Sequence, residues 1–357
     1  MFKRFIVLLV NFTIFSAFTA CAQTPGAPGG KLTVVATTTL IGDVTENIGG
    51  DLLDLTVLMP AGVDPHSFEP TPADLSKMAD ADLVFVNGIE FEGFLGKLIE
   101  NAGDEAKVVV VSDGINTLAL DQDTHVHADE EHDHEHADEH DDAGHDDAGH
   151  ADDHAEEEHD HEHADEHDDA GHDDAGHAHE HGEFDPHVWH NPANVILWTE
   201  NIAEALSVQD PANAATYRAN ADAYITELQE LDTWIEAQIA QIPEANRRLV
   251  TEHGTLGYFA TRYGLEVVGA AIPGFSTLAQ PSAQELAALA DAIHDLDVKA
   301  IFVGNTVNPN VASQIAQDTG IQLIPIYTDS LSPADGPAAT YLAFMRFNVE
   351  AIVAALK

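Results

Sequence analysis

The sequence predicts an α/β protein with two parallel-sheet lobes joined by one long rigid helix. Short runs rich in β-branched residues recur in both halves of the chain, with helical patterns between them. One apolar stripe with a spacing of three or four residues then separates the two halves. Alternating strands and helices are typical of βαβ units, which build parallel sheets. We therefore expect one parallel-sheet lobe on each side of a connecting helix.

The first lobe is predicted to comprise residues 31–120, with the remainder at 184–210. Pro192 can open a helix in that remainder, and Asn191 is a suitable N-cap. The predicted strands of the first part are Leu32–Thr37, Leu53–Met59, Asp82–Asn87 and Lys107–Ser112, with helices at Pro72–Ala79 and Phe94–Ala102.

The connecting helix is predicted over residues 211–242. Asp210-Pro211 is a start signal and Pro243 is a stop signal. A helix of this length would span about 48 Å. The apolar stripe between these signals consists of Tyr217, Ala221, Tyr224, Leu228, Leu231, Ile235, Ile239 and Ile242.

Residues 243–357 form the predicted second lobe, in which the alternation of strands and helices resumes. The expected strands are Leu249–Glu252, Leu265–Ile272, Lys299–Val303 and Gln322–Tyr327, and the expected helices are Ser282–Leu296, Asn310–Thr319 and Pro337–Leu356.

The amino terminus has the pattern of an export signal. Lys3 and Arg4 precede an uncharged, mostly apolar stretch that ends near residue 20 and is too short to span a membrane. Residues 18–21 resemble a lipobox, which would make Cys21 the lipidated first residue of the mature chain, followed by a flexible tether over residues 21–30. A signal peptidase site at the same place would instead release a soluble exported protein. Both alternatives place the protein outside the cytoplasm.

The charge of the chain is strongly negative and unevenly distributed. The 357 residues include 63 acidic and 13 basic side chains, for a net charge of −50. This sign argues against nucleic acid as a partner, because phosphate would be repelled. The single cysteine excludes an intramolecular disulfide.

Residues 121–183 form a tract of histidine and carboxylate. It holds 28 acidic residues, 17 histidines and no lysine or arginine, and the 22-residue unit 130–151 recurs identically at 157–178. Because large apolar residues are scarce, the tract is expected to be disordered. Its histidines predict weak binding of additional divalent metal ions, since imidazole is a good ligand for transition metals. The alternative is a solvated linker of biased composition.

Four residues outside the tract form a candidate metal site. His66 lies in Asp64-Pro65-His66 after a predicted strand, and His187 lies in the segment 185–192 before a helix. His253 and Asp329 each follow a predicted strand. In parallel sheets, ligands bind beyond the carboxyl ends of strands. Three imidazoles and one carboxylate form a four-ligand set suited to Zn²⁺, although the wide sequence separations make spacing alone weak support.

These motifs resemble the metal-binding receptors of ABC importers in the cluster A-I (ZnuA/TroA-like) family. The similarity covers about residues 31–119 and 183–357 and rests on five motifs. They are Gly-Val-Asp-Pro-His-Ser-Phe-Glu-Pro at 62–70, Asp-Pro-His-Val-Trp at 185–189, His253 with Gly257-Tyr258-Phe259, Gln280-Pro281-Ser282, and Thr328-Asp329.

The resemblance implies that His66, His187, His253 and Asp329 bind the ion between the lobes. It also implies partners, namely a membrane permease and an ATPase, and a small closing motion limited by the connecting helix. Manganese members often have a carboxylate at the third ligand position, so His253 and the tract favour Zn²⁺, with Mn²⁺ as the alternative. We expect a monomer. We expect no enzyme activity, because four protein ligands would fill the coordination positions of the ion.

The chain departs from the family pattern at two places. His190 replaces a usually apolar residue. Its side chain could lie at the surface, act as a fifth ligand or bind the ion on its way into the site, and we expect it at the surface. Residues 302–306 replace the Glu-Pro often found after that strand. Glu252 and Asp64 could accept hydrogen bonds from the ligand imidazoles or point to solvent, and His294 is expected at the surface.

Two functions of other classes compete with the receptor. An exported zinc hydrolase would need an open coordination position and a general base, and the chain lacks an H-E-x-x-H helix. A metal-chelating surface adhesin would use the globular part only to display the tract.

Overall fold

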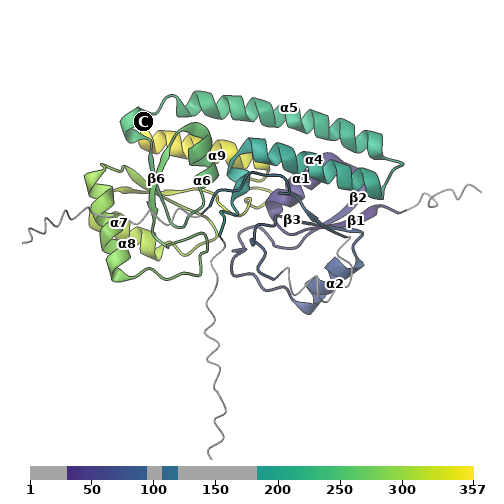
Figure 1. Ribbon diagram of the computed structural model, residues 1–357, viewed down its shortest axis with the longest axis horizontal. Coiled ribbons are helices and arrows are strands. Elements are labelled where there is room, and N and C mark those ends of the chain that lie inside the picture. Colours follow the sequence, from purple (N-terminus) through teal and green to yellow (C-terminus); the bar gives the residue numbers. More distant parts are fainter. Residues whose placement is uncertain (1–29, 95–106, 120–182) are drawn as a thin grey trace, which may run out of the picture.

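The computed structural model describes residues 30–94, 107–119 and 183–357. Within these residues the chain forms two four-stranded parallel sheets, which lie side by side beneath the long helix α5 (Ala214–Ile239) (Figure 1). The predicted fold class, an α/β protein with two parallel-sheet lobes and a long connecting helix, is confirmed. No helix among the described residues is both long and apolar enough to cross a membrane.

The first lobe contains a sheet with the strand order β2-β1-β3-β4, in which all neighbours are parallel. Helices α1 and α4 lie between this sheet and α5, and α2 lies on the opposite side (Figure 1). The elements are β1 (Leu32–Ala36), α1 (Thr39–Gly49), η1 (Gly50–Leu52), β2 (Leu53–Val57), α2 (Pro72–Asp80), β3 (Leu83–Val86), β4 (Val108–Val110), η4 (Val188–His190) and α4 (Pro192–Gln209).

The second lobe repeats the same arrangement with the strand order β6-β5-β7-β8. Helices α7 and α8 lie on the side of the sheet away from α5 and α9 (Figure 1). The elements are η5 (Glu244–Asn246), β5 (Arg248–Thr251), α6 (Gly257–Tyr263), β6 (Glu266–Ala270), α7 (Ala283–Asp295), β7 (Ala300–Val303), α8 (Asn310–Thr319), β8 (Gln322–Pro325) and α9 (Tyr341–Leu356).

Helix α5 is held against both lobes by the apolar stripe predicted from the sequence. It packs on α1 and α4 of the first lobe and on α9 of the second. With 26 residues it spans about 39 Å, because the helix begins and ends a few residues inside the predicted range. The buried residues are those of the stripe up to Ile239: Tyr217, Ala221, Tyr224, Leu228, Leu231, Ile235 and Ile239.

Most other elements lie where the sequence predicts them, and their ends differ by one or two residues. The helix expected from Pro337 begins only at Tyr341, because Thr340 caps it by accepting a hydrogen bond from the Ala343 N–H. Helices α1 and α6 lie outside the predicted ranges. In α1 two glycines weaken the helical pattern, and the burial of apolar side chains such as Leu40 and Val44 outweighs that preference.

Several predicted segments lie wholly or largely outside the described residues. They are the export signal and tether at 1–30, the helix at 94–102 and the histidine tract at 121–183. The division of the chain into these functional segments therefore stays a prediction.

Candidate metal centre

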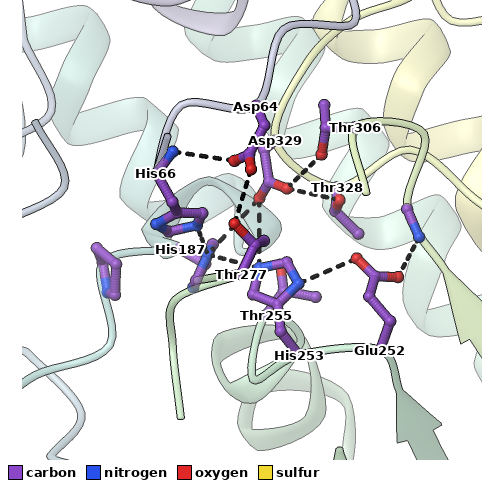
Figure 2. Close-up of polar contacts among 12 residues, drawn as sticks. Asp64, His66, His187, Glu252, His253, Thr255, Thr277, Thr306, Thr328 and Asp329 are labelled. Atoms are coloured by element: carbon purple, nitrogen blue, oxygen red, sulfur yellow. Dashed lines mark hydrogen bonds and ion pairs between the residues drawn. The ribbon is translucent and has the colours of Figure 1, made fainter. Parts of the chain in front are cut away.

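The structure brings all four predicted residues together between the lobes. One ligand atom from each of His66, His187, His253 and Asp329 lies within 4.8 Å of every other, and the four form a group that could hold a metal ion (Figure 2). His187, His253 and Asp329 are buried, whereas His66 is half-buried. These residues are up to 263 positions apart in the sequence, so the site exists only in the folded chain.

The sheets explain why these residues meet. His66 follows β2, His253 follows β5 and Asp329 follows β8, so three of the four lie beyond the carboxyl ends of parallel strands. Both sheets change winding direction at their centres, between β1 and β3 and between β5 and β7. Loops diverge at such switch points and leave room for a ligand. The residues that follow the strands of the two sheets meet at the lobe boundary.

The two Asp-Pro-His segments use the same local turn. The Asp64 carboxylate accepts a hydrogen bond from the His66 backbone N–H at 3.0 Å, and Asp185 accepts one from the His187 N–H at 2.9 Å. This is the Asx-turn that aspartate favours, and the intervening proline stiffens it. Each aspartate therefore fixes the backbone of the histidine two residues later.

Carboxylates also orient two of the imidazole rings. His187 Nδ1 donates to Asp185 Oδ1 at 2.8 Å, and His253 Nδ1 donates to Glu252 Oε1 at 3.0 Å. With Nδ1 protonated, Nε2 of each neutral ring carries a lone pair that points to the centre of the group. Glu252 thus accepts a hydrogen bond from the neighbouring His253 imidazole and does not point to solvent, which was the other alternative.

The separations of the ligand atoms fit a single ion. Nε2 of His187 lies 3.3 Å from Nε2 of His66 and 3.2 Å from Nε2 of His253. Asp329 Oδ1 lies 3.6 Å and 3.8 Å from Nε2 of His187 and His253. Two ligands on a tetrahedral ion with bonds of about 2.0–2.1 Å are about 3.3 Å apart. Without an ion, a proton on one nitrogen of each pair can form a hydrogen bond across these separations, and a bound metal ion would take the place of that proton.

Asp329 supplies a polar atom that lacks a hydrogen-bond partner. Its Oδ2 accepts from Thr306 Oγ1 at 2.9 Å and from Thr328 Oγ1 at 2.8 Å. Its Oδ1 is buried and has no hydrogen-bond partner among the described residues. Because an unpaired buried carboxylate oxygen is costly, this atom fits a cation ligand.

The electrostatics of the group distinguish the three histidines. Desolvation lowers the pKa of both His66 and His187 to about 3, and neighbouring histidines add to this effect. Burial alone would also lower the pKa of His253, but the Asp329 and Glu252 carboxylates raise it to about 8. Burial opposes ionisation of Asp329, yet the three histidines lower its pKa to about 2. Burial raises the pKa of Asp185 to about 8.

Hydrogen bonds cross the lobe boundary around the group. Thr277 Oγ1, from the loop after β6, donates to Asp64 Oδ2 at 2.7 Å (Figure 2). The Gly62 N–H donates to Ser330 Oγ at 2.9 Å, and the Leu331 N–H donates to a first-lobe threonine hydroxyl. The loop that carries His66 is therefore attached to the second lobe at both sides of the site.

His190 does not lie at the surface, so that expectation is wrong. Only 1% of the residue is exposed, its Nε2 lies 3.3 Å from Thr255 Oγ1, and its ring packs on Phe344. The short helix η4 places this side chain against Phe344 of α9 and Thr255. It is not part of the four-residue group. His294 is exposed on α7, as predicted.

Sequence reasoning missed three residues that hold the ligands in place. They are Asp185, Thr277 and Thr306. A signal for Asp185 was available, because the Asp-Pro-His triplet occurs twice with the same spacing. Thr277 and Thr306 contact residues 213 and 23 positions away, and no local pattern marks such contacts.

Comparison with known proteins agrees with this geometry. Residues 34–355 match the family described as ZnuA, zinc-uptake complex component A, periplasmic. The chain is 30% identical over 329 residues to the manganese-binding lipoprotein MntA of Halalkalibacterium halodurans, which covers 92% of this chain and 89% of the relative. It is 29% identical over 363 residues to the manganese ABC transporter substrate-binding lipoprotein PsaA of Streptococcus pneumoniae, covering 99% of each.

Solved structures show the same fold. The periplasmic zinc-binding protein TroA from Treponema pallidum aligns with a TM-score of 0.72 and 25% identity, over 92% of this chain and 99% of that one. A manganese-bound periplasmic metal-binding protein from Candidatus Liberibacter asiaticus aligns with a TM-score of 0.68 and 27% identity, over 92% and 100%. The chain therefore belongs to the ZnuA family of extracytoplasmic metal-binding receptors of ABC importers, and it is a binding protein rather than an enzyme.

Proposed function

We propose that this chain captures Mn²⁺ or Zn²⁺ outside the cytoplasm through His66, His187, His253 and Asp329. It then delivers the ion to a membrane permease driven by an ATPase. One observation carries the proposal: three inward-facing imidazole nitrogens and one unpaired carboxylate oxygen converge between two lobes. A buried carboxylate oxygen without a hydrogen-bond partner is costly, and a bound cation would offset that cost.

Manganese is the cargo that the relatives support. The two relatives compared by sequence are a manganese-binding lipoprotein and a manganese ABC transporter substrate-binding lipoprotein, and one of the two solved structures is manganese-bound, whereas TroA is named a zinc-binding protein. These names support the manganese alternative better than the zinc cargo predicted from the sequence. An extracytoplasmic receptor for manganese uptake is therefore the first candidate.

Zinc is the second candidate, and the donor set favours it. Imidazole suits zinc, whereas carboxylate and water oxygens suit manganese. Three of the four donors here are imidazoles, at separations close to those around a tetrahedral ion. The histidine at position 253 is thus the specific observation for zinc.

The arrangement couples binding to the relative position of the lobes. His66 and His187 come from the first lobe, and His253 and Asp329 come from the second. Neither pair alone completes a four-ligand shell, so a bound ion holds the lobes together. Helix α5 packs on both lobes and should restrict release to a small tilt or to movement of the His66 loop.

Two further parts of the proposal rest on the sequence alone, because they concern segments outside the described residues. The 17 histidines of residues 121–183 would collect additional metal ions weakly and raise their local concentration. A lipid on Cys21 would keep the receptor at the membrane, close to the permease.

Transport identifies the cargo more directly than affinity does. A site of nitrogen and oxygen donors generally binds Zn²⁺ more tightly than Mn²⁺, whichever ion is carried. We would therefore measure uptake of radioactive manganese and zinc in cells that depend on this receptor. Asp329→Ala should abolish uptake of the true cargo, and His294→Gln, at an exposed histidine on α7, should leave it unchanged. Undiminished uptake of both ions by Asp329→Ala would contradict the proposal.

A further inference from the structure

The two oxygens of Asp329 have different environments. Oδ2 accepts two hydrogen bonds, from Thr306 Oγ1 and Thr328 Oγ1, whereas Oδ1 faces His187 and His253 (Figure 2). A carboxylate oxygen has two lone-pair directions, so the two hydroxyls fill the hydrogen-bonding capacity of Oδ2. The ion can reach a free lone pair only on Oδ1.

The hydroxyl of Thr306 reaches Asp329 because the loop after β7 approaches very closely. A Cβ atom at Gly304 would lie 2.1 Å from Thr328 Oγ1 and 2.7 Å from Glu252 Oε1. The Gly304 N–H itself donates to Glu252 Oε2, and Glu252 orients His253. This loop therefore supports Asp329 and His253 at once.

A carboxylate that binds through one oxygen suits some ions more than others. Zn²⁺ is stable with four ligands in a tetrahedron. Mn²⁺ favours more ligands and more oxygen among them, so it gains from a carboxylate that binds through both oxygens. The hydrogen bonds to Oδ2 oppose this second mode.

We propose that Thr306, together with Thr328, sets the selectivity of the site by holding Asp329 as a one-oxygen ligand. This restraint favours four-coordinate Zn²⁺ relative to Mn²⁺. The inference rests on the proposed function, in which the four residues bind the cargo. Thr306 is thus a positioning residue, and it acts on the ion only through Asp329.

The test compares Thr306→Val with Thr306→Ser in the full chain. Valine keeps the branched shape without the hydroxyl, and serine keeps the hydroxyl. Competition with a chelator at one equivalent of metal gives the dissociation constants for Zn²⁺ and Mn²⁺. Loss of a hydrogen bond to a charged group should lower the preference for Zn²⁺ about tenfold in Thr306→Val. Thr306→Ser should retain the original preference.

A matched control separates this effect from a general loss of packing. Thr319→Val removes a half-buried hydroxyl that donates to the Ile315 carbonyl on α8, and it should leave the Zn²⁺/Mn²⁺ preference unchanged. X-ray absorption of the metal-loaded proteins should show an additional oxygen neighbour in Thr306→Val only. A simple packing defect would not add a ligand.

Three results would overturn the inference. They are an unchanged preference in Thr306→Val, an equal loss of affinity for both ions without an added oxygen ligand, and a Thr306→Ser protein that behaves like Thr306→Val. Failure of the proposed function is a different result, because the unmodified chain would then lack a tight equivalent of either ion.

Discussion

Protons should compete with the metal in this site at a higher pH than ordinary histidines allow. A histidine ligand must be deprotonated to bind a metal ion. The pKa of His253 is raised to about 8, so both ring nitrogens of this residue are protonated in the metal-free protein at neutral pH. Metal affinity should therefore fall as the pH decreases through 8. The pKa values of His66 and His187, at about 3, add nothing in this range.

The size of the fall follows from these values. One competing proton with a pKa of about 8 should reduce the apparent affinity about eightfold between pH 8.5 and pH 7.0. Three histidines with the ordinary value of about 6.5 would reduce it only about twofold. If Asp185, whose pKa is also about 8, loses its proton when a cation binds His187, the reduction should reach about 70-fold.

The assay is competition with a chelator of known pH dependence, at one equivalent of metal. Glu252→Gln should reduce the effect, because it removes one of the carboxylates that raise the pKa of His253. His294→Gln, at an exposed histidine, should leave the effect unchanged. A reduction of twofold or less in the unmodified protein would refute the reasoning. The three-histidine group would then titrate as independent residues.

Three further predictions test the roles of particular segments. Deletion of residues 121–182 should remove several weak metal equivalents and leave one tight equivalent, as measured by titration with metal. His66→Ala in the deleted protein should then abolish the tight equivalent, and tight binding that survives this substitution would contradict the assignment. Thr277→Val removes the hydroxyl that holds Asp64 and should speed metal release about tenfold in stopped-flow measurements, whereas an unchanged rate would show that this contact does not restrain the loop. His190→Leu should change the metal affinity by less than about threefold, because His190 is outside the four-residue group, and loss of the tight equivalent would instead make it a ligand.

The structure brings together residues that were predicted from local motifs, in which the residue type carries the chemistry. His66 and His187 stand out because a proline and an aspartate precede each of them, and this arrangement reflects a turn that forms locally. The prediction for His190 failed because the exposure of a side chain depends on which other elements cover it. Helix α9, more than 150 residues later, supplies Phe344 against that ring.

The sequence by itself determined the alternation of strands and helices, the long apolar stripe of α5 and the four candidate ligands. These features depend on periodicity, on turn residues and on ligand chemistry, all of which are local. Only the tertiary structure decided which oxygen of Asp329 faces the histidines, which histidine is positively charged at neutral pH and which threonines restrain the loops. Such properties arise from burial and from contacts between residues far apart in the chain, and a linear pattern does not record them.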